Sequence, residues 1–259
     1  MKEGETKQKT CEIHGDYLAR SIVFSHDIGA DGSRVMWTGC PMCDEIHDAE
    51  VIERRAAIAE RQAEAKLKRQ NIEPMYSAST LDNLEPLTDA HTRATKYARS
   101  MVADRCGKLV LLGNHGTGKT HLAVSIVREL DGAIYTMYEI GSRIRASYVS
   151  GARETELQIV GELARLPMLA IDEIGRTKGS EAETNWISYI IDKRHTRRLP
   201  LVLISNRHLR RDCKNGGCAR CLENYIAEDV MSRLAEDGRM VVFDGDDYRR
   251  KKRLQKEQK

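Results

Sequence analysis

The sequence predicts an α/β fold, with a parallel sheet covered by helices on both faces, preceded by a small module and a long helix. The main observation is a set of apolar segments that alternate with helical ones, at residues 108–112, 133–137, 168–173 and 201–206. Continuous apolar runs are typical of parallel strands that are buried on both faces. Two short cysteine and histidine spacings near the N-terminus predict the module, and the glycine- and proline-free stretch after them predicts the helix.

Two ligand pairs near the N-terminus predict a zinc site. Two residues separate Cys11 from His14 and also Cys40 from Cys43, and 25 residues lie between the pairs. Each pair fits a tight turn, and two such turns complete a tetrahedral Zn²⁺ site. A region of about forty residues has too little apolar surface to fold unaided, so the metal is expected to stabilise it.

The region between these pairs leaves other interpretations open. Residues 17–22 and 35–37 have the composition of short strands around a polar turn at 27–33. His26 and His47 are rival fourth ligands with less regular spacing. Free thiols beside a surface histidine would explain the same residues without a metal.

Residues 44–70 predict one long helix, because they are rich in alanine, glutamate, arginine and lysine and contain no glycine or proline. The apolar stripe of this helix is narrow. A narrow stripe favours a solvated linker over a helix that docks weakly on a partner.

The segment after the first apolar run fits the pattern G-x-x-x-x-G-K-[ST] between a strand and a helix. Glycines let backbone N–H groups point at phosphate oxygens, and the following helix adds its positive N-terminal end. Lys119 is expected to reach the β- and γ-phosphates, and the Thr120 hydroxyl to bind Mg²⁺. The competing interpretation is a glycine-rich turn without a ligand. The residues predicted to bind a nucleoside triphosphate are Gly113, Asn114, His115, Gly116, Thr117, Gly118, Lys119, Thr120 and His121.

Polar side chains end two later apolar segments. Asp172 and Glu173 end the segment 168–173, and Asn206 ends 201–206. Ligands of open α/β sheets bind outside the carboxyl ends of the strands, where these residues are expected to lie. Asp172 is predicted to hold Mg²⁺ through water, and Glu173 to orient and polarise the attacking water. An exposed acidic turn is the competing interpretation of the two acids.

Helices are predicted on either side of these segments. A proline ends the long helix near residues 71–74, and a loop follows at 80–87. The further helices are predicted at 89–106, capped by Thr88 or Asp89, and at 121–130, 139–150, 154–165 and 181–195.

Five segments together resemble the AAA+ ATPases, and among them the DnaC-type helicase loaders and their relatives, the IstB-type transposition ATPases. They are GNHGTGKT at 113–120, LAIDEIG at 169–175, LVLISN at 201–206, VMSRL at 230–234 and FDGDDYR at 243–249. The resemblance covers about 74–249 and implies an AAA+ ATPase domain there. The ligand spacings, the helical composition and the terminal charge add a zinc-binding module at 1–43, a linker helix at 44–73 and a basic tail at 250–259.

The resemblance also implies roles for three polar residues. Asn206 matches sensor 1, and Arg249 matches the sensor-2 arginine. Arg233 matches the arginine finger, which in this family reaches the ATP of a neighbouring subunit and stabilises charge in the transition state. A surface ion pair is the ordinary explanation for a single arginine at either place.

Single-stranded DNA is a further partner that the resemblance implies. Tyr148 falls on the helix where loaders and initiators place an aromatic residue against DNA, with Arg145 beside it and Ser180 near a second such contact. A tyrosine beside arginines is suited to stacking on a base. Half-buried packing explains a helical tyrosine equally well. Ala182 stands where a second aromatic residue would be expected, which weakens the DNA interpretation.

A second cysteine cluster lies between the Asn206 segment and the helix of Arg233. Cys213, Cys218 and Cys221 fall within nine residues, in a loop with two glycines. His208 is the nearest fourth ligand for Zn²⁺, and Cys106 is a less favoured one. The spacing also occurs in iron–sulfur proteins, and free thiols in a loop remain an alternative.

Composition narrows the possible functions. The formal net charge is +3, and seven of the last eleven residues are Lys or Arg, so this tail is either a solvated end or a contact with a phosphate backbone. No apolar run is long enough to span a membrane, and the polar N-terminus does not predict a secretory signal. A cytoplasmic protein is therefore expected, because cysteines at these spacings indicate metal ligation rather than disulfides.

The function implied by these features is an ATPase that loads the replicative hexameric helicase onto single-stranded DNA during replication. ATP, Mg²⁺ and Zn²⁺ are the expected cofactors, and an ATP-bridged homo-oligomer is expected. A transposition helper that recruits a transposase is the first alternative. A nucleotide-switched adaptor that docks proteins and hardly hydrolyses ATP is the second.

Overall fold

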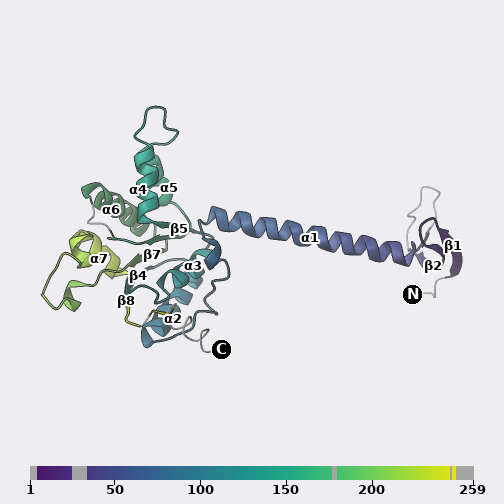
Figure 1. Cartoon of the computed structure of the whole chain (residues 1–259), viewed down its shortest axis with the longest axis horizontal. Coiled ribbons are helices and arrows are strands. Elements are labelled where there is room, and N and C mark those ends of the chain that lie inside the picture. Colours follow the sequence, from purple (N-terminus) through teal and green to yellow (C-terminus); the bar gives the residue numbers. More distant parts are fainter. Residues whose placement is uncertain (1–4, 25–33, 177–179, 246, 249–259) are drawn as a thin grey trace. The chain divides into compact units, whose positions relative to one another are not determined.

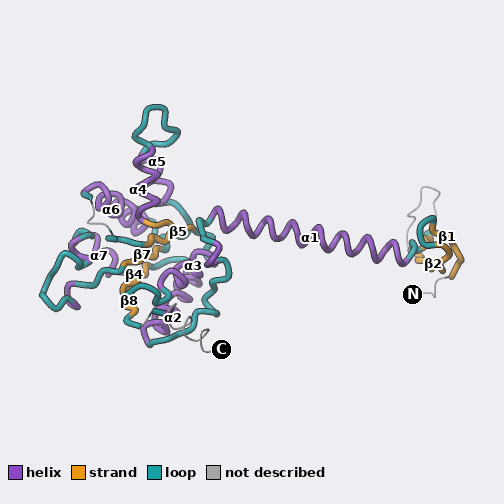
Figure 2. The backbone as a smooth tube through the Cα atoms, in the orientation of Figure 1, coloured by secondary structure: helices purple, strands orange, loops and turns teal. Residues whose placement is uncertain are grey.

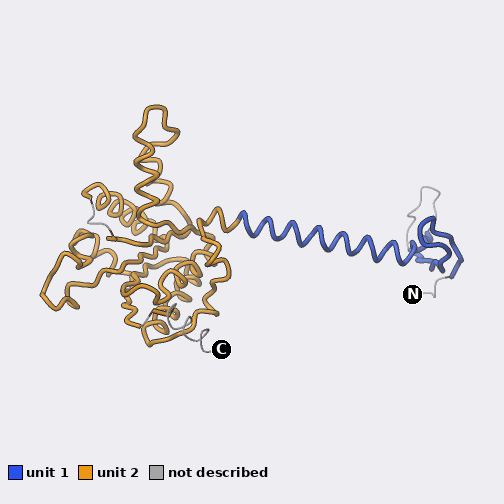
Figure 3. Tube along the Cα trace, viewed as in Figure 1, with its two compact units in different colours: residues 1–65 blue, residues 66–259 orange. Residues whose placement is uncertain are grey.

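The chain forms two compact units, at residues 1–65 and 66–259 (Figure 3). The computed structural model describes residues 5–24, 34–176, 180–245 and 247–248. Within that part of the chain, helix α1 (Pro41–Arg69) carries the backbone from the first unit into the second (Figure 1).

The first unit contains a three-stranded antiparallel sheet. Its strands are β1 (Thr6–Cys11), β2 (Gly15–Val23) and β3 (Val35–Trp37), in the order β1-β2-β3. The sequence predicted the last two strands but not β1, because its polar segment TKQKTC lacks the apolar alternation of a strand. Hydrogen bonding to β2 decides its conformation, with Cys11 opposite Gly15 at the tight turn.

Helix α1 begins three residues before the predicted start, at Pro41. Proline is tolerated in the first helical turn because its missing N–H has no partner there. None of its residues is buried. The earlier start places Cys43 within the first turn of the helix, directly beside the turn that carries Cys11 and His14.

The second unit is built on a five-stranded sheet in the order β5-β6-β7-β4-β8, and every described pairing in it is parallel. The strands are β4 (Lys108–Gly113), β5 (Ala133–Thr136), β6 (Leu169–Asp172), β7 (Leu201–Ser205) and β8 (Gly238–Phe243). The predicted α/β class and parallel sheet are confirmed.

Helices cover both faces of this sheet (Figure 2). One apolar cluster joins the sheet to α2 (Asp89–Asp104) and α3 (Lys119–Glu129). The other cluster joins the opposite face to four helices, which are α4 (Met137–Ala146), α5 (Glu156–Leu163), α6 (Glu181–Thr196) and α7 (Glu228–Glu236). Along β4, Leu109 and Leu111 belong to the first cluster, whereas Val110 and Leu112 belong to the second. This alternation explains why the strand is apolar at consecutive positions.

The edge strand β8 is a further element that the sequence did not predict. It pairs with β4 in parallel, with Lys108 opposite Gly238 and Gly113 opposite Phe243. Its sequence GRMVVF follows the pattern of an edge strand, with Arg239 and Val242 exposed and Val241 and Phe243 buried. The pairing brings the residues after Phe243 to the end of β4, where the glycine-rich loop begins.

Two helices on the second face are shorter than predicted. Thr136 caps α4 in a capping box with Glu139, and Thr155 caps α5 in a capping box with Gln158. Because α4 ends at Ala146, Tyr148 lies in the turn after the helix rather than on it. Short 3₁₀ turns complete the unit at Pro74–Tyr76, Arg210–Asp212 and Leu222–Asn224.

Candidate nucleotide site and metal centres

The glycine-rich loop connects β4 to α3. Gly113 needs to lack a side chain, because a Cβ there would lie 2.1 Å from the carbonyl oxygen of Phe243 on β8. Gly118 has φ +88° and stands immediately before the first residue of α3. The loop therefore delivers its backbone to the N-terminal end of the helix, where N–H groups lack partners within the helix.

Lys119 is buried beneath this loop, with 6% of its surface exposed. Its ammonium group donates hydrogen bonds to the carbonyl oxygens of Gly113, at 2.9 Å, and of Asn114. The lysine thus lies folded against the loop that is predicted to wrap phosphate. Phosphate oxygens offer stronger, charged acceptors than these carbonyl oxygens.

Thr120 and Asp172 come together as predicted for a magnesium site. The Thr120 hydroxyl donates to Asp172 Oδ2 at 2.8 Å, and the backbone N–H of Glu173 donates to Asp172 Oδ1 at 2.6 Å. Burial raises the pKa of Asp172 above its ordinary value, although these two hydrogen bonds act in the opposite direction. A carboxylate and a hydroxyl are oxygen ligands of the kind that Mg²⁺ takes.

The raised pKa has an expected consequence for magnesium binding. A raised pKa means that Asp172 becomes protonated at a higher pH than an exposed aspartate, whose pKa is about 4. We expect the gain in ATP affinity on adding Mg²⁺ to disappear as the pH falls, before an exposed aspartate would titrate. ATP binding measured with and without Mg²⁺ over a pH series tests this, and the magnesium-free series is the control. A magnesium effect that persists to about pH 4 would contradict this expectation.

Glu173 lies just beyond the end of β6 in a left-handed conformation, with φ +60°. Its carboxylate forms an ion pair with Arg176, three residues later. Asn206 follows β7, and its side-chain amide lies 3.4 Å from Nδ1 of His115 in the loop. The ends of β4, β6 and β7 therefore bring the predicted catalytic residues Glu173 and Asn206 to the same edge of the sheet.

A cavity of about 680 Å³ opens beside this edge. Among the residues that line it are the loop residues His115 to His121, together with Asp172, Glu173 and Asn206. Nε2 of His121 lies 3.2 Å from the carbonyl oxygen of Thr80 and 2.9 Å from Oδ1 of Asn83. Burial lowers the pKa of the His121 imidazole.

Of the lining residues that were not predicted from the sequence, two contact the backbone of the glycine-rich loop. His91 on α2 is 1% exposed, and its Nε2 lies 2.8 Å from the carbonyl oxygen of Thr117 in the loop. Tyr248 donates its backbone N–H to the carbonyl oxygen of Gly116 at 3.0 Å and its hydroxyl to Glu85 at 3.1 Å. His91 was missed because a single histidine in a helix does not form a recognisable sequence motif. The position of Tyr248 depends on β8, which was also missed.

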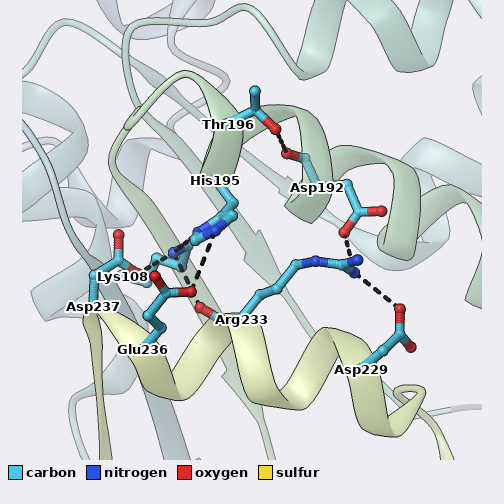
Figure 4. Close-up of polar contacts among 8 residues, drawn as sticks. All are labelled: Lys108, Asp192, His195, Thr196, Asp229, Arg233, Glu236 and Asp237. Atoms are coloured by element: carbon cyan, nitrogen blue, oxygen red, sulfur yellow. Dashed lines mark hydrogen bonds and ion pairs between the residues drawn. The ribbon is translucent and has the colours of Figure 1, made fainter.

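Arg233 lies on α7 and is bound within its own chain (Figure 4). Its guanidinium donates to Asp192 on α6 at 2.7 Å and to Asp229 at 2.9 Å, and its side chain is 35% exposed. Among the residues that the structure describes, Arg233 does not line the cavity. A role of Arg233 at the nucleotide of a neighbouring subunit is therefore a proposal. Arg249, the predicted sensor-2 residue, lies outside the described residues.

The predicted DNA contacts have different surroundings. Tyr148 is 62% exposed, and its hydroxyl donates to Glu156. Half-buried packing therefore does not explain this tyrosine. Arg145 donates to the Ser142 hydroxyl at 3.1 Å. Ser180 caps α6 by accepting a hydrogen bond from the backbone N–H of Glu183 at 3.2 Å, so its hydroxyl has a structural role.

The four predicted N-terminal ligands meet at one place. The ligand atoms of Cys11, His14, Cys40 and Cys43 all lie within 4.8 Å of one another. His14 Nδ1 is 3.3 Å from Cys43 Sγ and 3.8 Å from the sulfurs of Cys11 and Cys40. Backbone hydrogen bonds from Ile13 and His14 lower the pKa of Cys11 to about 6, whereas the hydrogen bond with Cys11 raises the pKa of Cys43 to about 11. Cys11 is thus the thiol of this pair that ionises first, and the thiolate is the form that binds metal. His47 is not in this group, and His26 lies outside the described residues.

Replacing Cys40 and Cys43 with serine is expected to remove one zinc ion per chain and to destabilise the sheet of the first unit. The reason is that, among its described residues, the first unit buries Ala19 and Cys40 but leaves Leu18, Val23 and Met36 exposed, so its apolar core is small. Zinc content and proteolytic sensitivity of the first unit would be measured on the full chain. Cys106→Ser is the matched control, because Cys106 belongs to neither ligand group. An unchanged zinc content in the double variant would rule out this site.

The second predicted cluster is also assembled. The ligand atoms of His208, Cys213, Cys218 and Cys221 lie within 4.8 Å of one another, and Cys106 is not among them. A hydrogen bond from the backbone of Asn215 is the main cause that lowers the pKa of Cys213 to about 6. Zn²⁺ prefers such a set of sulfur and imidazole ligands.

Among the described residues, no helix is both long and apolar enough to cross a membrane.

Comparisons with known proteins agree with this architecture. The family described as IstB-like ATP binding protein matches residues 43–256. The replicative helicase loader DnaC of Escherichia coli strain K12 is 27% identical over 209 residues, which cover 75% of this chain and 81% of that protein. An ATP-binding protein of insertion sequence IS5376 from Geobacillus stearothermophilus is 26% identical over 217 residues, 81% of each chain. The crystal structure of the DnaC helicase loader superposes with a TM-score of 0.56 at 23% identity, covering 66% of this chain and 99% of that one.

Proposed function

Because the chain belongs to the family of IstB-like ATP binding proteins, which matches it over residues 43–256, we propose that it is an ATPase that loads a replicative helicase onto single-stranded DNA. Membership in this family establishes an ATP-binding AAA+ fold. Hydrolysis, the helicase and DNA are the parts that we propose.

The observation that carries the ATPase proposal is the convergence of Lys119, Thr120, Asp172 and Glu173 at one edge of the sheet. Lys119 and the loop amides would bind the β- and γ-phosphates, with the lysine exchanging its carbonyl acceptors for phosphate oxygens. Thr120 and Asp172 would hold Mg²⁺, which neutralises phosphate charge when bound. Glu173 is placed to accept a proton from water once its carboxylate leaves Arg176. Asn206 would orient that water or the γ-phosphate.

The helicase as partner is supported by the similarity to DnaC, a replicative helicase loader, over 81% of that protein. On this proposal, the four-ligand group near the N-terminus binds Zn²⁺, and the first unit together with α1 is the arm that binds the helicase. Since none of its residues is buried, α1 suits a helix that is either solvated or bound by another protein.

A transposition helper is the second candidate, because the ATP-binding protein of insertion sequence IS5376 is 26% identical over 81% of each chain. In that case the ATPase chemistry is the same and the partner is a transposase. The exposed Tyr148 and the neighbouring Arg145 would contact single-stranded DNA on either proposal.

The experiment that separates these candidates is co-purification of the full chain with the hexameric replicative helicase and, in parallel, with a transposase of the same host. A stable complex with the helicase that depends on residues of the first unit supports the loader. ATP turnover is measured with and without single-stranded DNA in the same preparations. Binding to the transposase alone would replace the loader with the transposition helper, and the absence of turnover in all mixtures would contradict both ATPase proposals.

A further inference from the structure

The second group of metal-ligating side chains follows β7 and lies outside the cavity. His208 Nε2 is 3.3 Å from Cys218 Sγ and 3.5 Å from Cys221 Sγ, and Cys213 completes the group of four. Three sulfurs and one imidazole nitrogen around one point are a ligand set that Zn²⁺ takes in tetrahedral geometry. Cys221 is fully buried, so the group is part of the folded unit.

Backbone hydrogen bonds hold this loop in a definite conformation. The N–H groups of Cys218 and Arg220 donate to the sulfurs of Cys221 and Cys218, at 3.3 and 3.4 Å. The N–H of Leu222 donates to the carbonyl oxygen of His208 at 2.9 Å, which fixes the histidine beside Cys221. N–H groups that point at sulfur stabilise thiolates, the form in which cysteine binds a metal. Thiols in an unstructured loop would not have this arrangement.

Arg207 connects the ligand loop to the nucleotide site. It stands between Asn206, at the edge of the cavity, and the metal-ligating His208. Its Nη1 donates to the carbonyl oxygen of Ala219, at 2.6 Å, and its Nε donates to the carbonyl oxygen of Gly175, at 2.8 Å. Ala219 lies between Cys218 and Cys221, and Gly175 lies two residues after Glu173. One guanidinium therefore bridges the ligand loop and the turn that carries Glu173.

The contact between Arg207 and Gly175 is close and enclosed. Gly175 has φ +71°, and a Cβ at this position would lie 2.0 Å from Nε of Arg207. The guanidinium also lies over the ring of Tyr225, 5.2 Å from its centroid, and Tyr225 is 3% exposed. The half-buried arginine thus packs against both Gly175 and the ring of Tyr225.

The turn after β6 is tied to the end of β7 by two more hydrogen bonds. The N–H of Ile174 donates to the carbonyl oxygen of Ile204 at 3.0 Å, and the Ser205 hydroxyl donates to the carbonyl oxygen of Ile174 at 2.6 Å. Glu173 precedes this linked pair and Asn206 follows it. Displacing Arg207 would therefore disturb both residues that we assign to the attacking water.

We propose that His208, Cys213, Cys218 and Cys221 bind one Zn²⁺, and that this ion fixes Ala219 so that Arg207 positions Glu173 and Asn206 for hydrolysis. Arg207 is on this proposal a positioning residue, because it acts through Gly175 and not on the nucleotide. The part that concerns hydrolysis rests on the ATPase proposed above, whereas zinc binding does not.

Metal content of the purified full chain tests the site itself. The unmodified chain is expected to hold two zinc ions, and Cys218→Ser combined with Cys221→Ser is expected to leave one. The Cys106→Ser control is expected to keep two. His208→Cys is expected to keep two as well, because four thiolates also bind Zn²⁺ tetrahedrally. Zinc content that does not fall in the double variant, or the visible absorption of an iron–sulfur cluster, would overturn the proposal.

Kinetics and hydrogen exchange test the positioning role. The Cys218/Cys221 double variant and Arg207→Ala are expected to lower kcat by about 10-fold or more while changing KM for ATP by less than about 3-fold. The conservative variant His208→Cys, which keeps four ligands, is expected to retain kcat. In the double variant, amide exchange is expected to accelerate at residues 174–176 and 206–208 but not in the loop 113–120.

Each result decides one part of the proposal. Loss of one zinc ion with unchanged kcat and unchanged exchange would overturn the positioning role and leave the metal site standing. If the unmodified chain does not hydrolyse ATP, the proposed enzyme fails, and the exchange measurement still decides whether the metal fixes the Glu173 turn. Faster exchange throughout the second unit would show a general structural role and also overturn the specific one.

Discussion

Replacing Glu173 with glutamine is expected to leave ATP binding within about 2-fold of the unmodified chain and to slow hydrolysis by about 100-fold or more. Glutamine keeps the size of the side chain but cannot accept the proton of the attacking water. The phosphate-binding loop connects β4 to α3, whereas Glu173 follows β6, so the substitution leaves the phosphate-binding groups in place and affinity for ATP should be retained. Nucleotide affinity and single-turnover hydrolysis are the two measurements.

Two other variants serve as controls for the Glu173→Gln measurement. Lys119→Ala is expected to abolish ATP binding, because it removes the buried ammonium group beneath the loop. Arg176, whose side chain is 69% exposed, is the ion-pair partner of Glu173. Arg176→Ala is expected to leave turnover unchanged or to raise it slightly, because exposed ion pairs contribute little. Hydrolysis by Glu173→Gln at the unmodified rate would exclude Glu173 as the base.

Replacing Arg233 with alanine is expected to lower turnover by about 1,000-fold with ATP binding retained, if the arginine reaches the nucleotide of a neighbouring subunit. The structure shows what this movement requires. Arg233 has to leave Asp192 and Asp229, whose side chains are 42% and 65% exposed. Exposed ion pairs of this kind contribute about 0–1 kcal/mol each. A 1,000-fold effect corresponds to about 4 kcal/mol, so the gain in the transition state exceeds the loss of both pairs.

The helix that carries Arg233 is anchored independently of these pairs (Figure 4). The buried Lys108 donates to the Arg233 carbonyl oxygen at 3.1 Å and to His195 Nδ1 at 2.8 Å, and it forms an ion pair with Asp237. The backbone of α7 is therefore held on the sheet while the Arg233 side chain can change partners.

Mixing experiments decide whether Arg233 acts in trans. Combining Arg233→Ala with Lys119→Ala is expected to restore part of the turnover, because one variant supplies the site and the other the guanidinium. Asp192→Asn and Asp229→Asn are expected to change turnover by less than about 5-fold, since each removes a half-exposed ion pair. No restoration at saturating protein would assign Arg233 a structural role within its own chain.

The amino-acid sequence by itself determined the parts of this protein that depend on local pattern. The apolar runs predicted four of the five strands of the parallel sheet, and the glycines with Lys119 and Thr120 predicted the loop between β4 and α3. The short cysteine and histidine spacings predicted two ligand groups, whose atoms the structure brings together. Such features can be recognised because each lies within a few consecutive residues or obeys the period of a strand or helix.

Only the tertiary structure decided the features that join distant segments. Strand β8 becomes a strand by pairing with β4, and this pairing brings Tyr248 to the loop at Gly116. The burial of His91 beside Thr117 and the bridge made by Arg207 likewise depend on contacts between segments far apart in the chain. Hydrogen bonds between such segments leave no periodic trace in the sequence, because each of these bonds ends on a backbone carbonyl group, which every residue carries.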